Sequence, residues 1–260
     1  MRIPILPAAL VLLVAALGGC APVTAGSATP PLDGTAWILS SLHGRAPIGH
    51  EPITLRFEGG RLAGGDGCNR YSAAYVAKGA ALSINPAGAS TMMACEPPEV
   101  MEQARGYAAM LAAVKSHRVA DGQLQLLDGD GKVLATFAAQ AQELAGTSWR
   151  ALGINNGRGA VASIVRGTAV TLAFDTAGKA SGSAGCNNFM AGYEADPPKL
   201  RFSAPGSTRR MCAGEGVMEQ EAAFLAALQS VDTMRFEADR LELRRADGAL
   251  AVSLAREDGR

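Results

Sequence analysis

The sequence predicts an α+β protein, mostly β, made of two similar domains. Three observations predict this class. The chain contains an internal repeat, each copy has many short segments in which apolar and polar residues alternate, and each copy has a single helical pattern. We expect each domain to be a curled antiparallel sheet or a partly open barrel that is packed by one helix.

Residues 1–19 have the features of a cleaved signal peptide. Arg2 precedes an almost wholly apolar run from Ile3 to Leu17, and Gly18-Gly19-Cys20 follows. The run is too short to span a bilayer comfortably. A leucine and two small residues before a cysteine resemble the lipobox of bacterial lipoproteins, in which the cysteine carries the lipid anchor. We therefore predict lipidation at Cys20; the alternative is an ordinary secretory signal that ends near a free cysteine.

Residues 20–31 contain no charged side chain and suit a lipidated flexible tether. The predicted location is the bacterial cell envelope, with the lipid holding the chain on the outer membrane, facing the periplasm. Ala21 is compatible with onward export to that membrane. The whole chain has 24 basic and 24 acidic residues and no long basic block, so charge gives no reason to expect nucleic acid as a partner.

An internal repeat covers most of the remaining chain. Leu32–Trp37 matches Leu144–Trp149, and Val100–Gln103 recurs unchanged as Val217–Gln220. Each copy is much longer than a solenoid repeat, so each should form a complete domain.

The matching positions predict a first domain at 32–139 and a second at 143–256. The linker, 138–143, is short, so we expect the two domains to touch or nearly touch. The second copy has extra residues before its Gly-Cys-Asn sequence. The glycine- and asparagine-rich segment 155–167 is expected to hold them as an enlarged loop.

Strand patterns open and close each copy. Apolar residues alternate from Ile53 to Phe57 and run into Gly59-Gly60, which predicts a hairpin. Val170–Phe174 is the counterpart in the second copy. Further short segments of alternating apolar and polar residues follow the first cysteine of each copy, and others lie at the end of each copy.

One helix interrupts the strands of each copy. After two prolines, apolar residues are spaced by four, three, four and three positions, as on one face of an α-helix. These residues are Val100, Ala104, Tyr107, Leu111 and Val114. The second copy keeps the stripe, but Glu221 stands where the first has Ala104.

The four cysteines other than Cys20 divide into one pair per copy, Cys68 with Cys95 and Cys186 with Cys212. An exported chain matures in an oxidising space, which favours disulfides. Zinc is a weaker alternative because each copy offers only two isolated cysteines instead of four close ligands. Free thiols remain the other possibility.

These motifs together resemble the META domain, also called HslJ-like. The residues that carry the resemblance are an opening Gly-Thr-x-Trp, then Gly-Cys-Asn, Thr-x-x-x-Cys, Met-Glu-Gln and a closing Leu-x-Leu, in that order and twice. The resemblance implies a small α+β domain of exported bacterial proteins, often lipoproteins, with a loose link to envelope stress and antibiotic tolerance. It implies no enzymatic activity.

Several polar residues are candidates for a site, and most have a simpler interpretation. Asn69 and Asn187 are expected to take left-handed geometry or to hydrogen-bond the backbone, rather than to bind a ligand. Glu102 and Glu219 are expected at the surface or on a loop. The tryptophans that open each copy, Trp37 and Trp149, are expected to anchor the core.

Arg209 and Arg210, with Lys199 and Arg201 upstream, form the local basic cluster that we predict as a possible partner-binding site. It would favour an anionic partner such as a lipid headgroup or an acidic protein. A solvated loop is the alternative.

The sequence thus predicts a membrane-anchored, non-enzymatic interaction module that needs no cofactor or metal. No histidine, metal cluster or nucleophile motif is shared by both copies. Its partners are expected to be the membrane, through the lipid, and an envelope protein or ligand that the sequence does not identify. The alternative is a periplasmic enzyme inhibitor or a small-ligand-binding lipoprotein.

Overall fold

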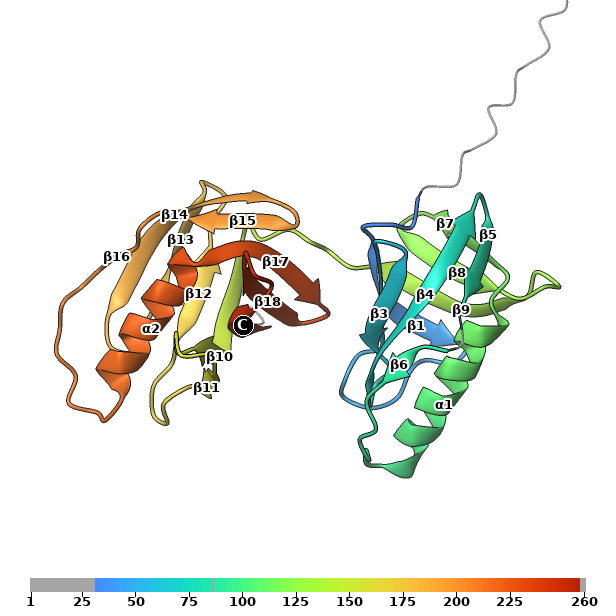
Figure 1. Cartoon of the computed structure of the whole chain (residues 1–260), viewed down its shortest axis with the longest axis horizontal. Coiled ribbons are helices and arrows are strands. Elements are labelled where there is room, and N and C mark those ends of the chain that lie inside the picture. Colours follow the sequence, from blue (N-terminus) through green and yellow to red (C-terminus); the bar gives the residue numbers. More distant parts are fainter. Residues whose placement is uncertain (1–30, 86, 258–260) are drawn as a thin grey trace, which may run out of the picture.

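The computed structural model describes residues 31–85 and 87–257, and it contains two domains that lie side by side (Figure 1). The predicted signal peptide and Cys20 lie outside the described residues. The tether prediction does as well, apart from Pro31. Neither helix of the described chain is long and apolar enough to cross a membrane.

The first domain contains nine strands and one helix. The strands are β1 (Ala36–Leu42), β2 (Thr54–Glu58), β3 (Arg61–Gly65), β4 (Arg70–Lys78), β5 (Ala81–Ile84), β6 (Ala89–Ser90), β7 (Ser116–Ala120), β8 (Gln123–Leu127) and β9 (Val133–Ala139). Helix α1 (Pro98–Ala113) lies between β6 and β7.

The second domain repeats this order with one additional strand. Its strands are β10 (Thr147–Asn155), β11 (Val161–Ser163), β12 (Thr171–Phe174), β13 (Lys179–Ser183), β14 (Asn188–Asp196), β15 (Lys199–Phe202), β16 (Gly206–Ser207), β17 (Val231–Glu237), β18 (Arg240–Arg245) and β19 (Leu250–Arg256). Helix α2 (Val217–Gln229) lies between β16 and β17.

Eight strands of each domain close into an antiparallel barrel. In the first domain β3 pairs with β4 and completes the ring, while β6 lies outside it on β4. In the second, β10 pairs with β19 and β12, with β11 and β16 outside the ring. The predicted α+β, mostly β fold is confirmed. The ring is complete, but β5 and β7 are joined by a single residue pair, Ala81 with Ser116.

The helices bury the stripe that the sequence predicts. Val100, Ala104, Tyr107, Leu111 and Val114 are all buried. The tryptophans are buried too, and each donates its indole N–H to the threonine two residues before it at 2.7 Å. The core of each domain therefore lies inside its barrel and beneath its helix.

The enlarged loop of the second copy contains a strand. Within 155–167, β11 pairs with the end of β10, so that Asn155 lies opposite Val161. The connection between the domains begins later than the sequence suggests, because β9 continues to Ala139. The segment 140–146 links β9 to β10.

Candidate functional site

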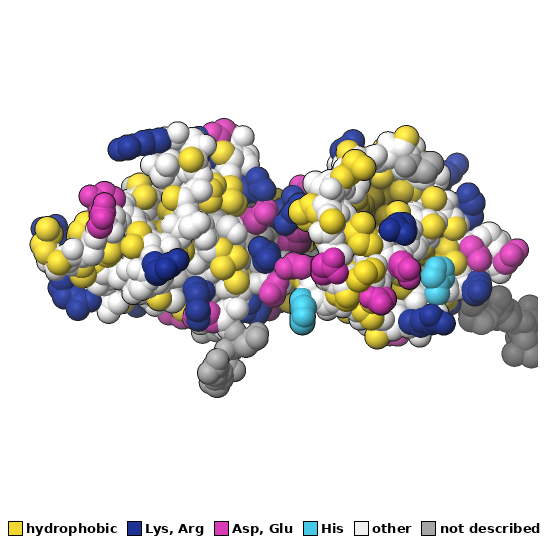
Figure 2. All heavy atoms as spheres, turned by 90° about the horizontal axis from the view of Figure 1, so that it is seen from below, with side chains coloured by type: hydrophobic (Ala, Val, Ile, Leu, Met, Phe, Trp, Pro, Cys, Tyr) yellow, Lys and Arg dark blue, Asp and Glu magenta, His cyan; other side chains and the backbone are white. Residues whose placement is uncertain are grey.

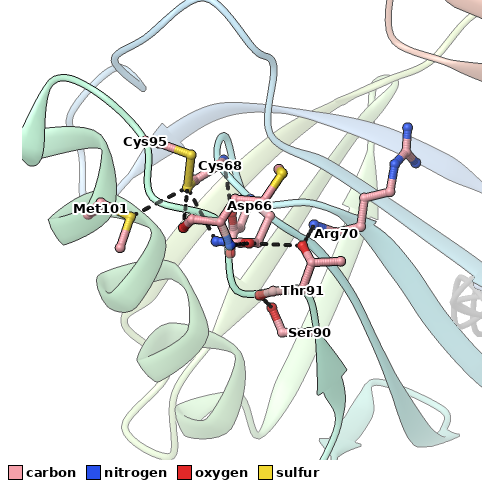
Figure 3. Close-up of a disulfide and its surroundings, with 9 residues drawn as sticks. Asp66, Cys68, Arg70, Ser90, Thr91, Cys95 and Met101 are labelled. Atoms are coloured by element: carbon pink, nitrogen blue, oxygen red, sulfur yellow. Dashed lines mark hydrogen bonds between the residues drawn. A yellow bond between two sulfur atoms is a disulfide. The ribbon is translucent and has the colours of Figure 1, made fainter.

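A disulfide ties the turn after the third ring strand of each domain to the loop before the helix. Cys68 bonds to Cys95, with their Cα atoms 5.8 Å apart, and Cys186 bonds to Cys212, with their Cα atoms 6.0 Å apart. These are the pairs that the sequence predicts. We call each disulfide with its surrounding residues a disulfide corner; Figure 3 shows the corner of the first domain.

The asparagine next to the first cysteine holds the loop that leads to the second cysteine. In the first domain, the Asn69 Oδ1 accepts hydrogen bonds from the Thr91 hydroxyl at 2.8 Å and from the Met93 backbone N–H at 2.7 Å. Asn187 makes the same two bonds in the second domain, to Thr208 and Arg210. The backbone-bonding interpretation of these asparagines is therefore correct, and the left-handed geometry belongs to the preceding Gly67 and Gly185.

Each corner contains one buried carboxylate, but the two domains supply it from different elements. In the first domain, the Asp66 Oδ1 accepts the backbone N–H groups of Cys68 and Asn69 at 2.9 and 2.6 Å. In the second domain, Glu221 on α2 accepts the backbone N–H of Asn187 at 2.8 Å and its side-chain amide at 3.0 Å. The positions corresponding to Asp66 and Glu221 in the other copy are both alanine, Ala184 and Ala104.

The glutamine of each Met-Glu-Gln motif fastens the loop between the first two ring strands. The Gln103 side chain accepts the Ile48 backbone N–H at 2.8 Å and donates to the Ile48 carbonyl at 3.0 Å. Gln220 accepts the Val165 N–H at 2.6 Å and donates to the Thr168 hydroxyl at 3.1 Å. This role was not predicted from the sequence. The unchanged recurrence of Val-Met-Glu-Gln was the available signal.

The signature residues of both copies are thus occupied in holding loops. Glu102 and Glu219 are exposed, as expected. Among the described residues, no three His, Cys, Asp or Glu side chains gather in a way that could hold a metal ion.

The structure divides the predicted basic cluster. Lys199 and Arg201 form ion pairs with Asp232 at 2.7 and 3.5 Å. The Arg210 guanidinium donates to the Cys186 carbonyl at 2.6 Å and so forms part of the second corner. Arg209 is exposed on the same loop. Partner binding by Arg209 and Arg210 remains a prediction.

A groove lies where the two domains meet, and its cavity volume is about 720 Å³. The first domain lines it with its disulfide corner and with residues 49–54 and 93–97. The second domain contributes the turn between β17 and β18, residues 237–240. This volume is typical of ligand-binding clefts, which measure roughly 300–1,000 Å³. Figure 2 shows acidic and basic side chains gathered where the domains meet.

The turn between β17 and β18 is held to the first domain by four side-chain contacts. The Arg70 guanidinium bonds to both carboxylate oxygens of Glu237 at 2.9 and 2.7 Å, and Arg240 pairs with Glu51 at 3.4 Å. Arg56 donates to the carbonyl of Phe236, and the Gln140 amide donates to that of Ala238 at 3.3 Å. The hydrogen bond with Glu237 raises the pKa of Arg70 above its ordinary value.

The charged residues at this junction occur only on the two domain faces that meet, and not at the equivalent positions of the other copy. Arg70, Glu237 and Arg240 are charged, whereas the equivalent residues of the other copy are neutral. Those equivalents are Asn188, Ala120 and Gln123. The outward-facing copy of each surface therefore lacks the ion pairs that join the two domains.

The fold and its corners define a class of protein, a tandem pair of disulfide-bonded β-barrel domains that are each packed by one helix. The chain belongs to the META domain family. The model of the META domain matches twice, at residues 30–141 and 142–258. The META domain is not a known enzyme family, and membership does not establish a function.

Two solved structures, both determined by NMR, are similar to one domain of this chain. A protein from Burkholderia xenovorans is 28% identical, with a TM-score of 0.39, and the match covers 45% of this chain and 85% of that one. A second is 22% identical, with a TM-score of 0.35, and the match covers 41% of this chain and 90% of that one. A comparison with curated proteins gives no match.

Proposed function

We propose that this chain is a non-enzymatic binding protein of the bacterial cell envelope, and that it holds a basic segment of another envelope protein in the groove between its domains. The observation that carries this proposal is the charge of the groove. Four acidic side chains and two basic ones line it. Two of the acids, Glu96 and Asp239, form no ion pair within the described residues.

The specificity of the junction supports the same proposal. The charged residues that join the domains have no charged counterparts in the other copy, so the groove depends on how these two particular faces meet. Lysine or arginine side chains of a basic segment would pair with Glu96 and Asp239. Such pairing is expected because the charges of two binding surfaces are complementary. The signature residues contribute stability to the walls of the groove through the disulfide corner.

The location in the envelope rests on the sequence of the N-terminus. The signal-like residues 1–19, followed by Cys20 and an uncharged tether, support lipidation. Metabolic labelling with a fatty acid tests this directly. Label is expected on the wild-type chain and not on Cys20→Ser. Label that persists on the variant would rule out this anchor.

Photo-crosslinking in cells tests the groove. A photoreactive residue is placed at Glu96, which lines the groove, or at its counterpart Ala213 in the second domain, which is exposed and does not line it. A reproducible partner is expected from position 96 and not from position 213. Mass spectrometry of the captured peptide should show an excess of lysine and arginine.

A charge-matched pair of variants completes the test. Glu96→Gln with Asp239→Asn should reduce the crosslinking yield, measured with the photoreactive residue at His50, another position that lines the groove. Glu194→Gln with Asp196→Asn removes the same charge from the exposed end of β14 and should leave the yield unchanged. Equal effects of the two pairs would show that net charge, and not the groove, governs capture.

A further inference from the structure

A second cavity lies wholly within the first domain, between α1 and the strands β4, β5 and β6, with a volume of about 130 Å³. Figure 2 shows a hollow in this domain that is rimmed mainly by hydrophobic side chains. The walls are formed by the buried residues Ala73, Ile84 and Leu111 together with the exposed Ala108 and Ala112 of the helix. A cavity of about 150 Å³ accommodates a benzene molecule, so this one is of the size of a single ring.

Six polar side chains also line the cavity. Asp66 and Tyr107 are buried and Tyr71 is half-buried, whereas Asn85 and Ser90 are exposed and Ser72 accepts a hydrogen bond from Arg61. The Tyr71 hydroxyl donates to the Thr54 carbonyl at 2.8 Å, so its single proton is used. The 2.7 Å bond between the two hydroxyls must therefore be donated by Tyr107 to Tyr71. Burial raises the pKa of both phenols, so both stay protonated.

This assignment leaves only acceptors available on the buried acid and the two phenols. The Tyr107 oxygen keeps its lone pairs, and the protons of both hydroxyls are committed. Asp66 uses Oδ1 for two backbone N–H groups, and its Oδ2 has no hydrogen-bond partner within the described residues. A molecule that reaches Asp66 and the two phenols must bring its own donor, because an acceptor placed there would meet no free proton of these groups.

The second domain carries apolar residues at the positions of Asp66, Tyr71 and Tyr107, and larger residues at the walls. The three polar residues become Ala184, Phe189 and Phe224. Larger residues stand at the walls: Ala108 corresponds to Leu225 and Ile84 to Phe202, and both of these pack against the core. The two copies therefore differ at this place, because the second has larger, apolar side chains where the first has small ones together with hydroxyl and carboxylate groups.

We propose that this cavity of the first domain is a binding site for a small uncharged ring compound that carries one hydrogen-bond donor, of the phenol class. The ring would occupy the apolar space between Ala73, Ile84 and Leu111. Its hydroxyl would donate to Tyr107 or Asp66. The site is separate from the groove between the domains. This proposal can therefore be tested independently of the proposed protein partner.

Titration of the full mature chain, followed by ¹H–¹⁵N NMR, tests the site with three probes: phenol, anisole and benzene. Phenol is expected to give saturable shifts at the amides of α1, β4 and β6. Anisole, which has no donor, should bind about tenfold more weakly, the usual effect of one lost hydrogen bond to a buried group. The absence of saturable shifts with phenol would overturn the proposal, as would equal binding of phenol and anisole.

Two variants that borrow residues from the second domain provide controls. Ala108→Leu with Ala112→Gln fills the cavity with the residues that α2 carries, Leu225 and Gln229, so the fold should tolerate them. This variant should lose the phenol shifts while its melting temperature stays close to that of the wild type. Tyr107→Phe should bring the phenol and anisole affinities closer together. Unchanged phenol binding by the filled variant would place the ligand elsewhere.

Discussion

The carboxylate of Glu221 holds the side chain and the backbone of Asn187, and through them the disulfide corner of the second domain. Asn187 is 1% exposed and Glu221 7% exposed, and the carboxylate accepts both the backbone N–H and the side-chain amide. Asn187 in turn holds the loop, because its side-chain oxygen accepts hydrogen bonds from Thr208 and Arg210. One buried acid on the helix thus fixes the loop before the helix through Asn187, which lies 34 residues away in sequence.

Replacing Glu221 by alanine should destabilise the second domain by about 2–3 kcal/mol, because two buried N–H donors would lose a charged acceptor. Urea unfolding measures this loss. Hydrogen exchange at the Asn187 amide should accelerate at the same time, because that amide loses its bond to Glu221.

A compensating change should restore much of this stability. Ala184→Asp combined with Glu221→Ala recreates the arrangement of the first domain, where Asp66 lies opposite Ala104. The double variant is expected to recover at least half of the loss. A double variant no more stable than Glu221→Ala would show that the two carboxylates do not play equivalent roles.

Removing the disulfide of the first domain should cost about 3.5 kcal/mol, from the loop-closure entropy of a bond between cysteines 27 residues apart. Cys68→Ser with Cys95→Ser is the variant, and unfolding in urea is the measurement. Cys186→Ser with Cys212→Ser is the matched control and should affect the second domain by a similar amount. A first domain that is equally stable with and without the bond would show that the bond adds no net constraint.

The repeat made much of this architecture predictable. The disulfide pairs, the helical stripe around Tyr107 and the many short strands follow from local spacing and from the oxidising environment, and the structure has all of them. Closure of the barrel was not predictable in the same way. It depends on the pairing of β10 with β19, which lie at opposite ends of one copy, and no local pattern specifies that register.

The groove and the carboxylate exchange could not be predicted either. Arg70 and Glu237 are separated by 167 residues and stand at positions that do not correspond in the two copies, so comparing the copies does not bring them together. The sequence shows Glu221 in place of Ala104, but not that Asp66 supplies the missing charge from a different element. Both relationships arise from tertiary packing, which a comparison of aligned positions does not reveal.

The ion pair between Arg70 and Glu237 should contribute modestly to domain docking. The Arg70 side chain is 57% exposed and that of Glu237 11% exposed, so solvent screens the pair, and we expect a coupling of about 0.5–1 kcal/mol. A double-mutant cycle with Arg70→Asn and Glu237→Ala measures it, since these are the residues of the other copy. The NMR chemical shift of Ala238, whose carbonyl accepts the Gln140 amide across the junction, reports docking, and the docked population should fall with salt. A coupling energy of zero would show that the other contacts alone hold the turn.

His117 should make the first domain less stable in mild acid. Its ring is buried in β7, 3% exposed, with neither nitrogen hydrogen-bonded within the described residues. Burial lowers its pKa below the ordinary value of 6.5. Below that pH the unfolded chain takes up a proton that the folded chain refuses. Stability is therefore complete above pH 6.5 and falls as the pH drops from there towards the folded pKa.

His117→Met tests this relationship, because Met234 fills the equivalent buried position of the second domain. The variant should gain about 1–2 kcal/mol at neutral pH, since two buried nitrogens without partners disappear. It should also lose the decline in stability between about pH 7.5 and about pH 5.5, measured as the urea midpoint of the first domain. A variant that keeps the full decline would assign the acid sensitivity to other groups, whereas a flattened profile would identify His117 as its source.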